Sequence, residues 1–279
     1  MEVMGGPGRI DLHSHSMASD GQYPPAQVAA LARAAGVTVW GLCDHDTVAG
    51  LPAAADAAAA LGLRLVPGIE LSAFLERREI HLLGHFIDPV HPTLRAFEDF
   101  LADHRRHRVR AIVDRLTALG VHVTEEAIVR HSGGKTIGRP HVARAIVEVG
   151  GAASVRDAFD RWLGEGKPAY VQRYRLEAAD AVKLVRGAGG TVTIAHPGVS
   201  KLEAAEVARL AAAGVAGLEA IHPDHNPSVR EKYLRAAAAS GLVVTAGSDY
   251  HGPDVSPDRQ LGMVSMGEAA LAALEARRP

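Results

Sequence analysis

Residues 11–25 read DLHSHSMASDGQYPP, and this stretch joins an apolar segment to a polar loop near the start of the chain. Arg9–Leu12 is predicted to be the first strand. Successive side chains of a strand point to opposite faces, so His13 and His15 should share one face. Asp20 follows in the loop. Two imidazoles and a carboxylate at one strand end are therefore candidate ligands of a cation.

The composition bounds the class of protein. The chain has 279 residues, a formal net charge of −2 and 47% hydrophobic residues. That length fits one large domain, or a domain with an insertion. A near-neutral charge argues against bulk binding to duplex nucleic acid or to a membrane, and we expect a cytoplasmic protein because no apolar run or secretory leader is evident. The single cysteine, Cys43, excludes an internal disulfide framework and should be a buried thiol rather than a nucleophile.

Strand-like and helix-like segments alternate along most of the chain, which predicts an α/β protein with a parallel sheet, closed or open. The expected strands are Arg9–Leu12, Val37–Leu42, Leu63–Ile69, Ile80–Phe86, Val192–Ala195, Gly217–Ile221 and Leu242–Ala246. The expected helices between them are Pro25–Ala35, Leu51–Leu61, Ala178–Gly187, Ala204–Ala213 and Pro227–Ser240.

A mainly helical segment interrupts this alternation. Its expected helices are Asp99–Leu119, His141–Val149 and Ser154–Leu163. Between Asp99 and Arg175 the chain carries 14 Lys and Arg against 9 Asp and Glu, a net charge of +5 in a chain whose net charge is −2. The expected division is therefore an acidic main domain, residues 1–98 and 173–279, with an inserted basic domain, residues 99–172, that suits an anionic substrate.

Side chains that can bind metals recur at or near the ends of nearly all the expected strands. They are His13, His15, Asp20, His45, Glu70, His81, His196, Asp249 and His251. The carboxyl ends of parallel strands in a barrel converge on one face, where buried carboxylates need compensating cations. Singly, His81 could be a core histidine and His196 a turn residue, but the joint placement favours two or three divalent ions, with Zn, Mn and Fe all suited to these ligands.

These motifs resemble those of the PHP family, the polymerase and histidinol phosphatase metal-dependent phosphoesterases. The matching stretches are DLHSHSMASDG, LCDHDTVAGL, VPGIELSA, EIHLLGHFID, TIAHPG and GSDYHG. Three stretches of the insertion are similar to a subgroup that acts on nucleoside 3′,5′-bisphosphates and the ends of short RNA. They are FLADHRRHRVRAIVDRL, TIGRPHVARAIV and EGKPAYV. The resemblance implies a distorted (β/α)7 TIM-like barrel, of about seven βα units, with residues 99–172 as a helical cap.

The resemblance also implies a trinuclear metal site. One ion would be held by His13, His15, Glu70 and Asp249. Glu70 would bridge to a second ion, also held by His81 and His196. The third ion would be held by Asp20, His45 and His251. Some relatives have histidine at the position of Asp20, and the carboxylate favours Mn, with Fe and Zn as alternatives.

We expect hydroxide activated by the metal ions near Glu70 and Asp249 to attack phosphorus in line. His222 and His225 follow the expected strand Gly217–Ile221. One of them could protonate the leaving oxygen or contact substrate, and we take His225 as the catalytic residue and His222 as the substrate contact. A plain surface position is equally open. Asp11 and Asp44 each adjoin an expected ligand and could accept N–H bonds from the ligands or cap the sheet ends, two alternatives that stay open.

Basic residues of the insertion are candidate ligands of a second phosphate, one that is not cleaved. Arg105 and Arg108 are three residues apart, so they share a face of the expected helix. Arg139 and His141 lie near a helix start, and Lys167 is a further candidate. Arginine binds phosphate through two parallel hydrogen bonds. The alternative is a solvated basic helix.

The expected function is hydrolysis of a phosphate ester on a small nucleotide, either a nucleoside 3′,5′-bisphosphate or the 5′ end of a short RNA. One alternative is a phosphatase for a simple phosphomonoester such as histidinol phosphate. A second is a non-catalytic module accessory to a polymerase, and a third is hydrolysis of a C–N bond, against which the basic insertion argues. No obligate protein partner is evident from the sequence.

Overall fold

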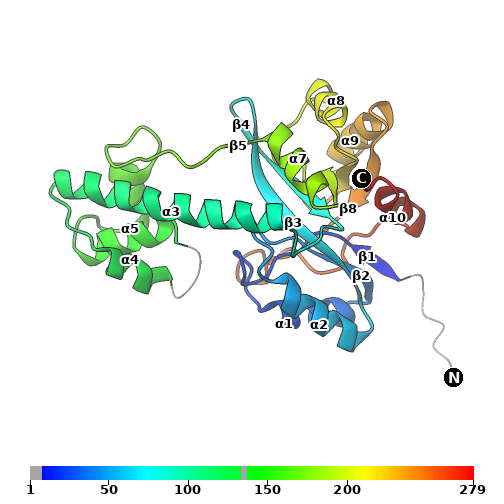
Figure 1. The fold of residues 1–279 in the computed structure, drawn as a ribbon, viewed down its shortest axis with the longest axis horizontal. Coiled ribbons are helices and arrows are strands. Elements are labelled where there is room, and N and C mark those ends of the chain that lie inside the picture. Colours follow the sequence, from blue (N-terminus) through cyan, green and yellow to red (C-terminus); the bar gives the residue numbers. More distant parts are fainter. Residues whose placement is uncertain (1–7, 133–136) are drawn as a thin grey trace. The chain divides into compact units, whose positions relative to one another are not determined.

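The computed structural model describes residues 8–132 and 137–279, and the chain divides into two compact units (Figure 1). Unit 1 consists of Met1–Arg95 and Leu176–Pro279, and unit 2 is Ala96–Arg175. The limits of unit 2 lie three residues outside the expected insertion at each end. Thr136, which opens the stretch TIGRPHVARAIV, is outside the described residues.

Unit 1 is built on an eight-stranded sheet with the order β1-β2-β3-β4-β6-β7-β8, in which β5 pairs with β3. The strands are β1 (Arg9–Asp11), β2 (Val37–Leu42), β3 (Arg64–Leu75), β4 (Arg78–His85), β5 (Leu176–Glu177), β6 (Thr191–Ile194), β7 (Gly217–Ile221) and β8 (Val243–Ala246). Most pairs are parallel, but β4 is antiparallel to both β3 and β6. The sheet is therefore mixed, which corrects the expectation of a parallel sheet.

The departure lies in β3 and β4, which form a long antiparallel hairpin, drawn in cyan in Figure 1. β3 does not end at Ile69, because Gly68–Leu75 pairs residue by residue with Arg78–His85. Glu70 is thus inside a strand rather than at its end. His81 lies early in β4, and since β4 runs opposite to its neighbours, its early residues lie at the edge where the parallel strands end.

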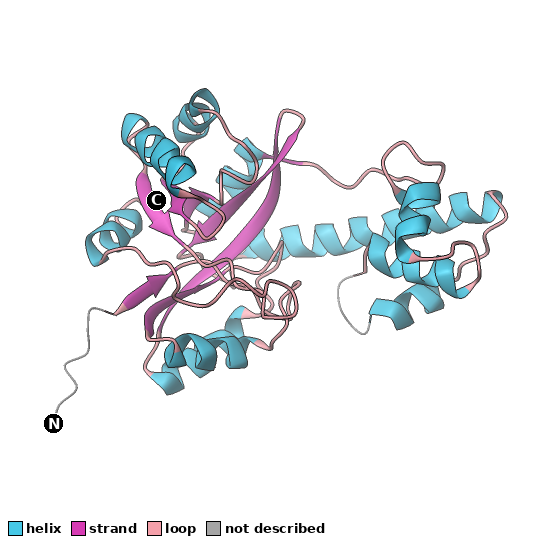
Figure 2. Cartoon of the chain, turned by 180° about the vertical axis from the view of Figure 1, so that it is seen from behind, coloured by secondary structure: helices cyan, strands magenta, loops and turns pink. Residues whose placement is uncertain are grey.

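The helices of unit 1 surround this sheet (Figure 2). They are α1 (Pro25–Ala34), α2 (Leu51–Leu61), α7 (Ala178–Gly187), α8 (Ala204–Ala212), α9 (Pro227–Ala239) and α10 (Glu268–Glu275). Local signals explain their limits: α1 begins with a proline at its first position, Gly62 ends α2 with φ 60°, and the Asn226 side chain accepts a hydrogen bond from Val229 N at 3.0 Å to cap α9. Only α10 was not expected.

Tight backbone packing joins the first strands. A Cβ atom on Gly41 of β2 would lie 2.3 Å from Leu12 O, so only glycine lets the two segments approach this closely. Ile10, Leu12 and Val39 are buried with Leu271 and Leu274 of α10. The core beneath the strand ends is therefore fixed by strands from one end of the chain and a helix from the other.

The residues that follow β1 and β8 hydrogen bond to each other. Leu12 N donates to Ala246 O at 3.2 Å, His15 N to Tyr250 O at 2.8 Å, and Asp249 N to His13 O at 2.9 Å. β1 and β8 stand at opposite ends of the sheet order. These bonds bring two histidine-bearing and carboxylate-bearing segments, far apart in the sequence, side by side.

Unit 2 contains helices and loops but no strand in its described part (Figure 2). Its helices are α3 (Pro92–Ala118, of which the first turn belongs to unit 1), α4 (Glu125–Ser132), α5 (Arg139–Glu148) and α6 (Val155–Ala158), with a π-helical turn at Phe159–Leu163. Ile112, Leu116, Ile128, Val142 and Ile146 are buried in its own core. Helix α4 lies where a short connection was expected.

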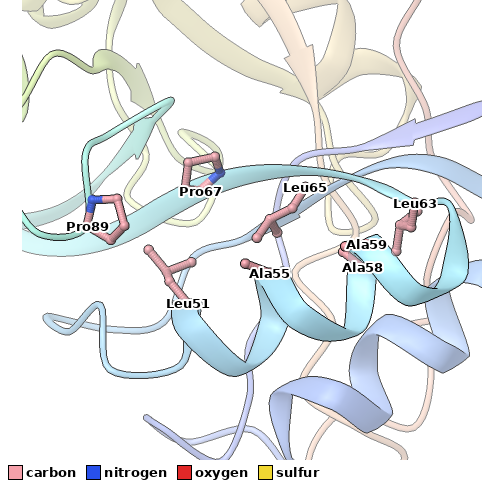
Figure 3. A pocket seen from close by; sticks show the side chains of 8 residues that line it. All are labelled: Leu51, Ala55, Ala58, Ala59, Leu63, Leu65, Pro67 and Pro89. Carbon is pink, nitrogen blue, oxygen red and sulfur yellow. The ribbon is translucent and has the colours of Figure 1, made fainter.

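An open apolar pocket of about 370 Å³ lies between α2 and β3 (Figure 3). Leu51, Leu65, Pro67 and Pro89 are among the residues that line it. Its lining residues are Leu, Ala and Pro, whose side chains have no acid, base, nucleophile or metal-binding group, so it is not a candidate active site.

None of the helices in residues 8–132 and 137–279 has the length and apolar character needed to cross a bilayer.

Candidate metal centre

The carboxylate of Glu70, on β3, is fully buried at the centre of a group of imidazoles. Its Oε2 atom is 3.1 Å from His13 Nε2 and 3.1 Å from His15 Nε2. Its Oε1 atom is 2.8 Å from His81 Nδ1 and 3.0 Å from His196 Nε2. Oε2 therefore faces two histidines of the segment after β1, and Oε1 faces one histidine of β4 and one that follows β6. A carboxylate whose two oxygens face separate groups of imidazoles has the geometry of a bridging ligand.

Asp249 completes the first expected ligand set. Its Oδ1 atom is 3.1 Å from His15 Nε2 and 3.4 Å from His13 Nε2. One donor atom from each of His13, His15, Glu70 and Asp249 lies within 4.8 Å of the others, and all four residues are buried. Donors this close together converge on a space that suits a single cation.

A second group surrounds Asp20, whose side chain is 55% exposed. Its carboxylate lies 3.7 Å from His45 Nε2 and 3.3 Å from His251 Nε2. Donor atoms of these three residues and of His15 lie within 4.8 Å of one another. The three residues expected to hold one ion are thus brought together, with His15 between the two groups.

The third group again includes Glu70. Donor atoms of His45, Glu70 and His81 lie within 4.8 Å of one another. The His196 ring lies 5.2 Å from the His81 ring, centroid to centroid. The structure therefore brings all nine expected ligands into one contiguous cluster, in which His45 joins the expected set of Glu70, His81 and His196.

Strained backbone positions two of these ligands. His196 follows β6 with φ 22°, and Asp249 follows β8 with φ 51°. Residues other than glycine seldom adopt positive φ, and such strain concentrates at functional sites. His196 N–H donates to the Glu219 carboxylate at 2.9 Å, which helps to hold the first of these conformations.

The charges of the cluster depend on each other. Burial by itself would lower the pKa of His15 and of His81, but carboxylates that include Glu70 raise these pKa values to about 9 and about 10. Burial opposes ionisation of Glu70 as well, yet the surrounding histidines hold its pKa well below the usual range. Bound protons thus balance the carboxylates, and divalent cations would take their place on binding.

Several imidazole nitrogens in the cluster are buried without a hydrogen-bond partner among the described residues. They are His15 Nδ1, His45 Nδ1, His196 Nδ1 and His222 Nε2. Buried polar atoms nearly always have a hydrogen-bond partner, so buried nitrogens without one beside converging carboxylates indicate a site that binds a further group. The nitrogen and oxygen donors present fit divalent metal ions.

Glu219, a buried residue of β7, was not among the residues predicted from the sequence. Its Oε1 atom is 3.1 Å from His13 Nδ1. This contact holds a proton of His13 on Nδ1, so Nε2, which faces Glu70 and Asp249, is the nitrogen that would give its lone pair to a metal ion once its own proton is displaced. The available signal was a glutamate inside the apolar strand GLEAI, since a lone buried charge needs a partner.

Arg259 was also missed. Its guanidinium donates to the Asp249 carboxylate and, at 3.1 Å, to the Asp249 carbonyl oxygen. It donates to the Asp224 carboxylate at 2.6 Å as well. The arginine therefore fixes the loop that carries Asp249. No pattern in the sequence distinguished it from other loop arginines.

Asp11 and Asp44 bind backbone and hydroxyl groups. Asp11 accepts N–H bonds from Ser248 at 2.9 Å and Gly262 at 2.8 Å. Asp44 accepts from Ser16 N at 2.8 Å and from Ser16 Oγ at 2.7 Å. Of the two alternatives left open, these contacts favour carboxylates that hold the loops at the strand ends.

Both histidines after β7 are buried, so the alternative of a surface position is wrong. His225 Nδ1–H donates to Ala220 O at 3.0 Å, and its Nε2 accepts from Gly198 N at 3.0 Å. With both ring nitrogens bound to backbone, His225 has no atom left for substrate. This geometry argues against a catalytic role for His225.

His222 has a different environment. Its Nδ1 accepts the backbone N–H of Asp224 at 3.1 Å, so its proton lies on Nε2. That Nε2 lies 3.5 Å from Asp249 Oδ2.

Cys43 is buried, and its thiol donates to Leu12 O at 3.3 Å. Burial raises the pKa of this thiol, so Cys43 is not an activated nucleophile.

The basic candidates of the insertion lie in unit 2. Arg108, on α3, donates from Nε to Val171 O at 2.8 Å, while burial and the nearby Arg139 lower its pKa to about 10. Arg139 begins α5 and lies over the rings of Phe159 and Tyr170. The remaining candidates are Arg105 on α3, His141, which caps α5 by accepting Gly138 N–H at 3.0 Å, and Lys167, which is exposed.

Comparisons with known proteins find a matching domain family and similar enzymes. The PHP domain profile matches residues 11–163. The chain is 35% identical over 249 residues to the 3′,5′-nucleoside bisphosphate phosphatase of Chromobacterium violaceum, covering 88% of this chain and 87% of that protein. It is also 35% identical over 249 residues to the 5′-3′ exoribonuclease Rnm of Salmonella typhimurium, covering 87% and 85%.

A solved structure described as a metal-dependent phosphoesterase, from Bifidobacterium adolescentis, matches with a TM-score of 0.78 at 29% identity, over 99% of this chain and 98% of that one. The chain belongs to the PHP domain family. The family resemblance noted in the sequence is thereby confirmed, and the chain is an enzyme of the phosphoesterase class.

Proposed function

We propose that the chain hydrolyses a phosphate ester of a nucleoside 3′,5′-bisphosphate, and that it also trims the 5′ ends of short RNA. The observation that carries the proposal is the buried cluster around Glu70, in a chain 35% identical to a bisphosphate phosphatase and to an exoribonuclease. By their names, one relative acts on nucleoside bisphosphates and the other on RNA, and both substrates are phosphate esters, so we assign both to the same site.

The proposed architecture is a distorted TIM-like barrel, residues 1–98 and 173–279, with residues 99–172 as a cap. The backbone hydrogen bonds between the segments after β1 and β8 support closure of the sheet, because these are the terminal strands in its order. The gathering of ligand-bearing segments at the ends of the parallel strands is typical of barrel enzymes.

Three divalent ions, Mn in particular, are proposed to occupy the cluster. The sets are His13, His15, Glu70 and Asp249; Glu70, His81 and His196; and Asp20, His45 and His251. Bound ions would lower the pKa of water and neutralise phosphoryl oxygens. The exposed carboxylate of Asp20 adds a hard oxygen donor, which favours Mn.

The chain's own residues then hold and move protons. The fixed tautomer of His222 presents an N–H at Nε2, beside Asp249, and this N–H is suited to donate to a phosphoryl or leaving oxygen. We assign this role to His222 rather than to His225, whose nitrogens are bound to backbone.

The uncleaved phosphate is proposed to bind Arg105, Arg108, Arg139, His141 and Lys167 in unit 2. Arg108 and Arg139 lie close enough for their repulsion to lower the pKa of Arg108, second to burial. An anion bound between them would relieve this repulsion and accept paired hydrogen bonds.

The test measures phosphate release from adenosine 3′,5′-bisphosphate with Mn and with a chelator, beside histidinol phosphate and an aryl phosphate. We expect selective, chelator-sensitive turnover of the bisphosphate.

Arg139→Ala should raise KM for the bisphosphate about tenfold, because one charge-assisted pair of hydrogen bonds is lost, and should leave KM for the aryl phosphate unchanged. Arg156→Ala, at a 93% exposed position of unit 2, is the control. Turnover of simple esters alone would contradict the proposal and favour the phosphomonoester alternative.

A further inference from the structure

Phe, Trp and Tyr together make up only 4% of this chain, yet two of them gather with a histidine ring on the surface of unit 2. Phe100 and Tyr174 lie 4.8 Å apart, centroid to centroid, in an edge-to-face contact. The His104 ring is 5.8 Å from Phe100 and 5.6 Å from Tyr174. Phe100 is 44% exposed and Tyr174 is 37% exposed. We call these three residues the aromatic platform.

The platform is continuous with the basic residues of unit 2. Phe100, His104 and Arg108 are spaced four residues apart on α3, so they share one face of the helix. A second segment runs along the same helix in the opposite direction: Tyr174 contacts Phe100, and Val171 accepts the bond from Arg108. From Phe100 to Arg108 the helix rises by roughly 12 Å.

This order of groups matches a nucleotide better than a phosphate alone. Exposed rings next to guanidinium groups are the usual means of binding unpaired bases, because any base can stack on a ring while the cations bind its phosphates. The edge-to-face contact between Phe100 and Tyr174 holds the rings before a ligand arrives, which lowers the entropic cost of binding.

We propose that the aromatic platform stacks the nucleobase of the phosphorylated substrate, with the phosphate held at Arg108 and Arg139. The inference rests on the proposed function for the phosphate contacts. It adds a base-binding site of broad base tolerance, since stacking distinguishes bases weakly. It predicts that the enzyme distinguishes nucleotides from phosphorylated sugars that carry no base.

A binding experiment tests the platform independently of catalysis. Chelator-treated protein is titrated with 2-aminopurine riboside 3′,5′-bisphosphate, whose fluorescence is quenched by stacking. We expect saturable quenching by the wild type, loss in Phe100→Ala and Tyr174→Ala, and retention in Phe100→Tyr. Leu119→Ala, which removes another large side chain that is 43% exposed in unit 2, is the control and should bind normally. Normal quenching by a Phe100→Ala/Tyr174→Ala double variant would overturn the proposal.

Kinetics then separate the base from the phosphates. With adenosine 3′,5′-bisphosphate and a short 5′-phosphorylated RNA, the double variant should show KM raised about tenfold or more at unchanged kcat. Ribose 3,5-bisphosphate, which has no base, should show no change. Equal losses on both substrates, or a lowered Tm without base selectivity, would show that the rings only pack against protein. If no phosphate is released from any substrate, the proposed function fails while the quenching result still stands.

Discussion

At the scale of single residues, the site depends on atoms that orient the ligands as much as on the ligands. Glu219 fixes His13, and Arg259 fixes the backbone and carboxylate of Asp249. Glu219 is buried and Arg259 is half-buried, and in such surroundings hydrogen bonds to charged groups are strong and the loss of one partner is costly. The direction of the His13 lone pair is therefore set by a residue that is not a ligand.

Glu219→Gln should weaken metal binding by roughly 10- to 100-fold. Glu219 accepts from both His13 Nδ1 and His196 N, whereas the glutamine amide has only one acceptor oxygen. One contact must then be lost, or the proton of His13 must move to Nε2. Calorimetric titration of the metal-free protein with Mn measures the effect. Glu231→Gln, an exposed residue of α9, is the control, and equal affinity of both variants would contradict this account.

Protonation of His85 should destabilise the protein in acid. Its Nε2–H donates to Leu12 O at 3.1 Å, and burial above all lowers its pKa to about 4. The unfolded histidine titrates near 6.5, so between these values the unfolded chain binds more protons and stability falls as the pH falls. The full shift corresponds to roughly 3 kcal/mol.

Urea unfolding of chelator-treated protein at pH 6.5 and pH 4.5 checks this prediction. His85→Asn should show a smaller loss of stability between these two pH values than the wild type. His107→Asn, at an exposed position of α3, should behave as the wild type does. An equal acid loss in all three proteins would show that other groups dominate.

At the scale of elements, the hairpin of β3 and β4 decides where ligands lie. Glu70 from the first strand and His81 from the second meet at 2.8 Å because the strands are antiparallel. The sequence analysis located β2, α2 and β7 to the residue, since flanking glycine and proline mark them. It ended β3 too early, because a two-sided buried strand and a hairpin strand have the same apolar pattern.

Two glycine-to-alanine substitutions should have opposite effects on stability. Gly41→Ala in β2 places a Cβ 2.3 Å from Leu12 O and should destabilise the protein by about 1–3 kcal/mol, the usual cost of overpacking. Gly187→Ala, at the end of α7, meets nothing within 4 Å and should stabilise by up to about 1 kcal/mol. Urea unfolding measures both, and a neutral Gly41→Ala would contradict the close approach of these segments.

At the scale of the whole molecule, metal binding should stabilise unit 1, because its ligands come from both ends of the chain. His13 and Asp249 are joined through β1 and β8, and an ion between them would tie these segments together. The unfolded chain holds no such arrangement, so the binding free energy adds to the free energy of unfolding.

Mn at a concentration 100 times its Kd should add about 2.7 kcal/mol for each independent site, seen as a rise in Tm on calorimetry. Asp249→Asn replaces a charged carboxylate by a neutral amide oxygen, a weaker ligand, and should reduce the rise. Asp160→Asn, which changes a 72% exposed carboxylate of unit 2, should not. If neither Mn nor a chelator changes the Tm of the wild type, a metal centre that includes Asp249 is contradicted.

The candidate ligands themselves were predictable from the sequence. Each of the nine has a side chain that can bind metal, and seven of them follow a predicted strand end within a few residues, where packing rules place functional groups. Asp20 lies further along the first loop, and His81 lies inside a predicted strand. His81 was named for its strand, while the antiparallel direction that brings it to Glu70 was not foreseen.

The sequence by itself determined the kinds of side chain, their attachment to strands, and the charge difference between the main domain and the insertion, because these follow from local pattern and composition. Only the tertiary structure decided the antiparallel hairpin, the Glu219 and Arg259 contacts, the burial of His222 and His225, and the aromatic platform. These features join residues as far apart as His13 and Glu219, or Phe100 and Tyr174. Such pairs form only when distant segments pack together, and local sequence patterns do not predict which distant segments will come into contact.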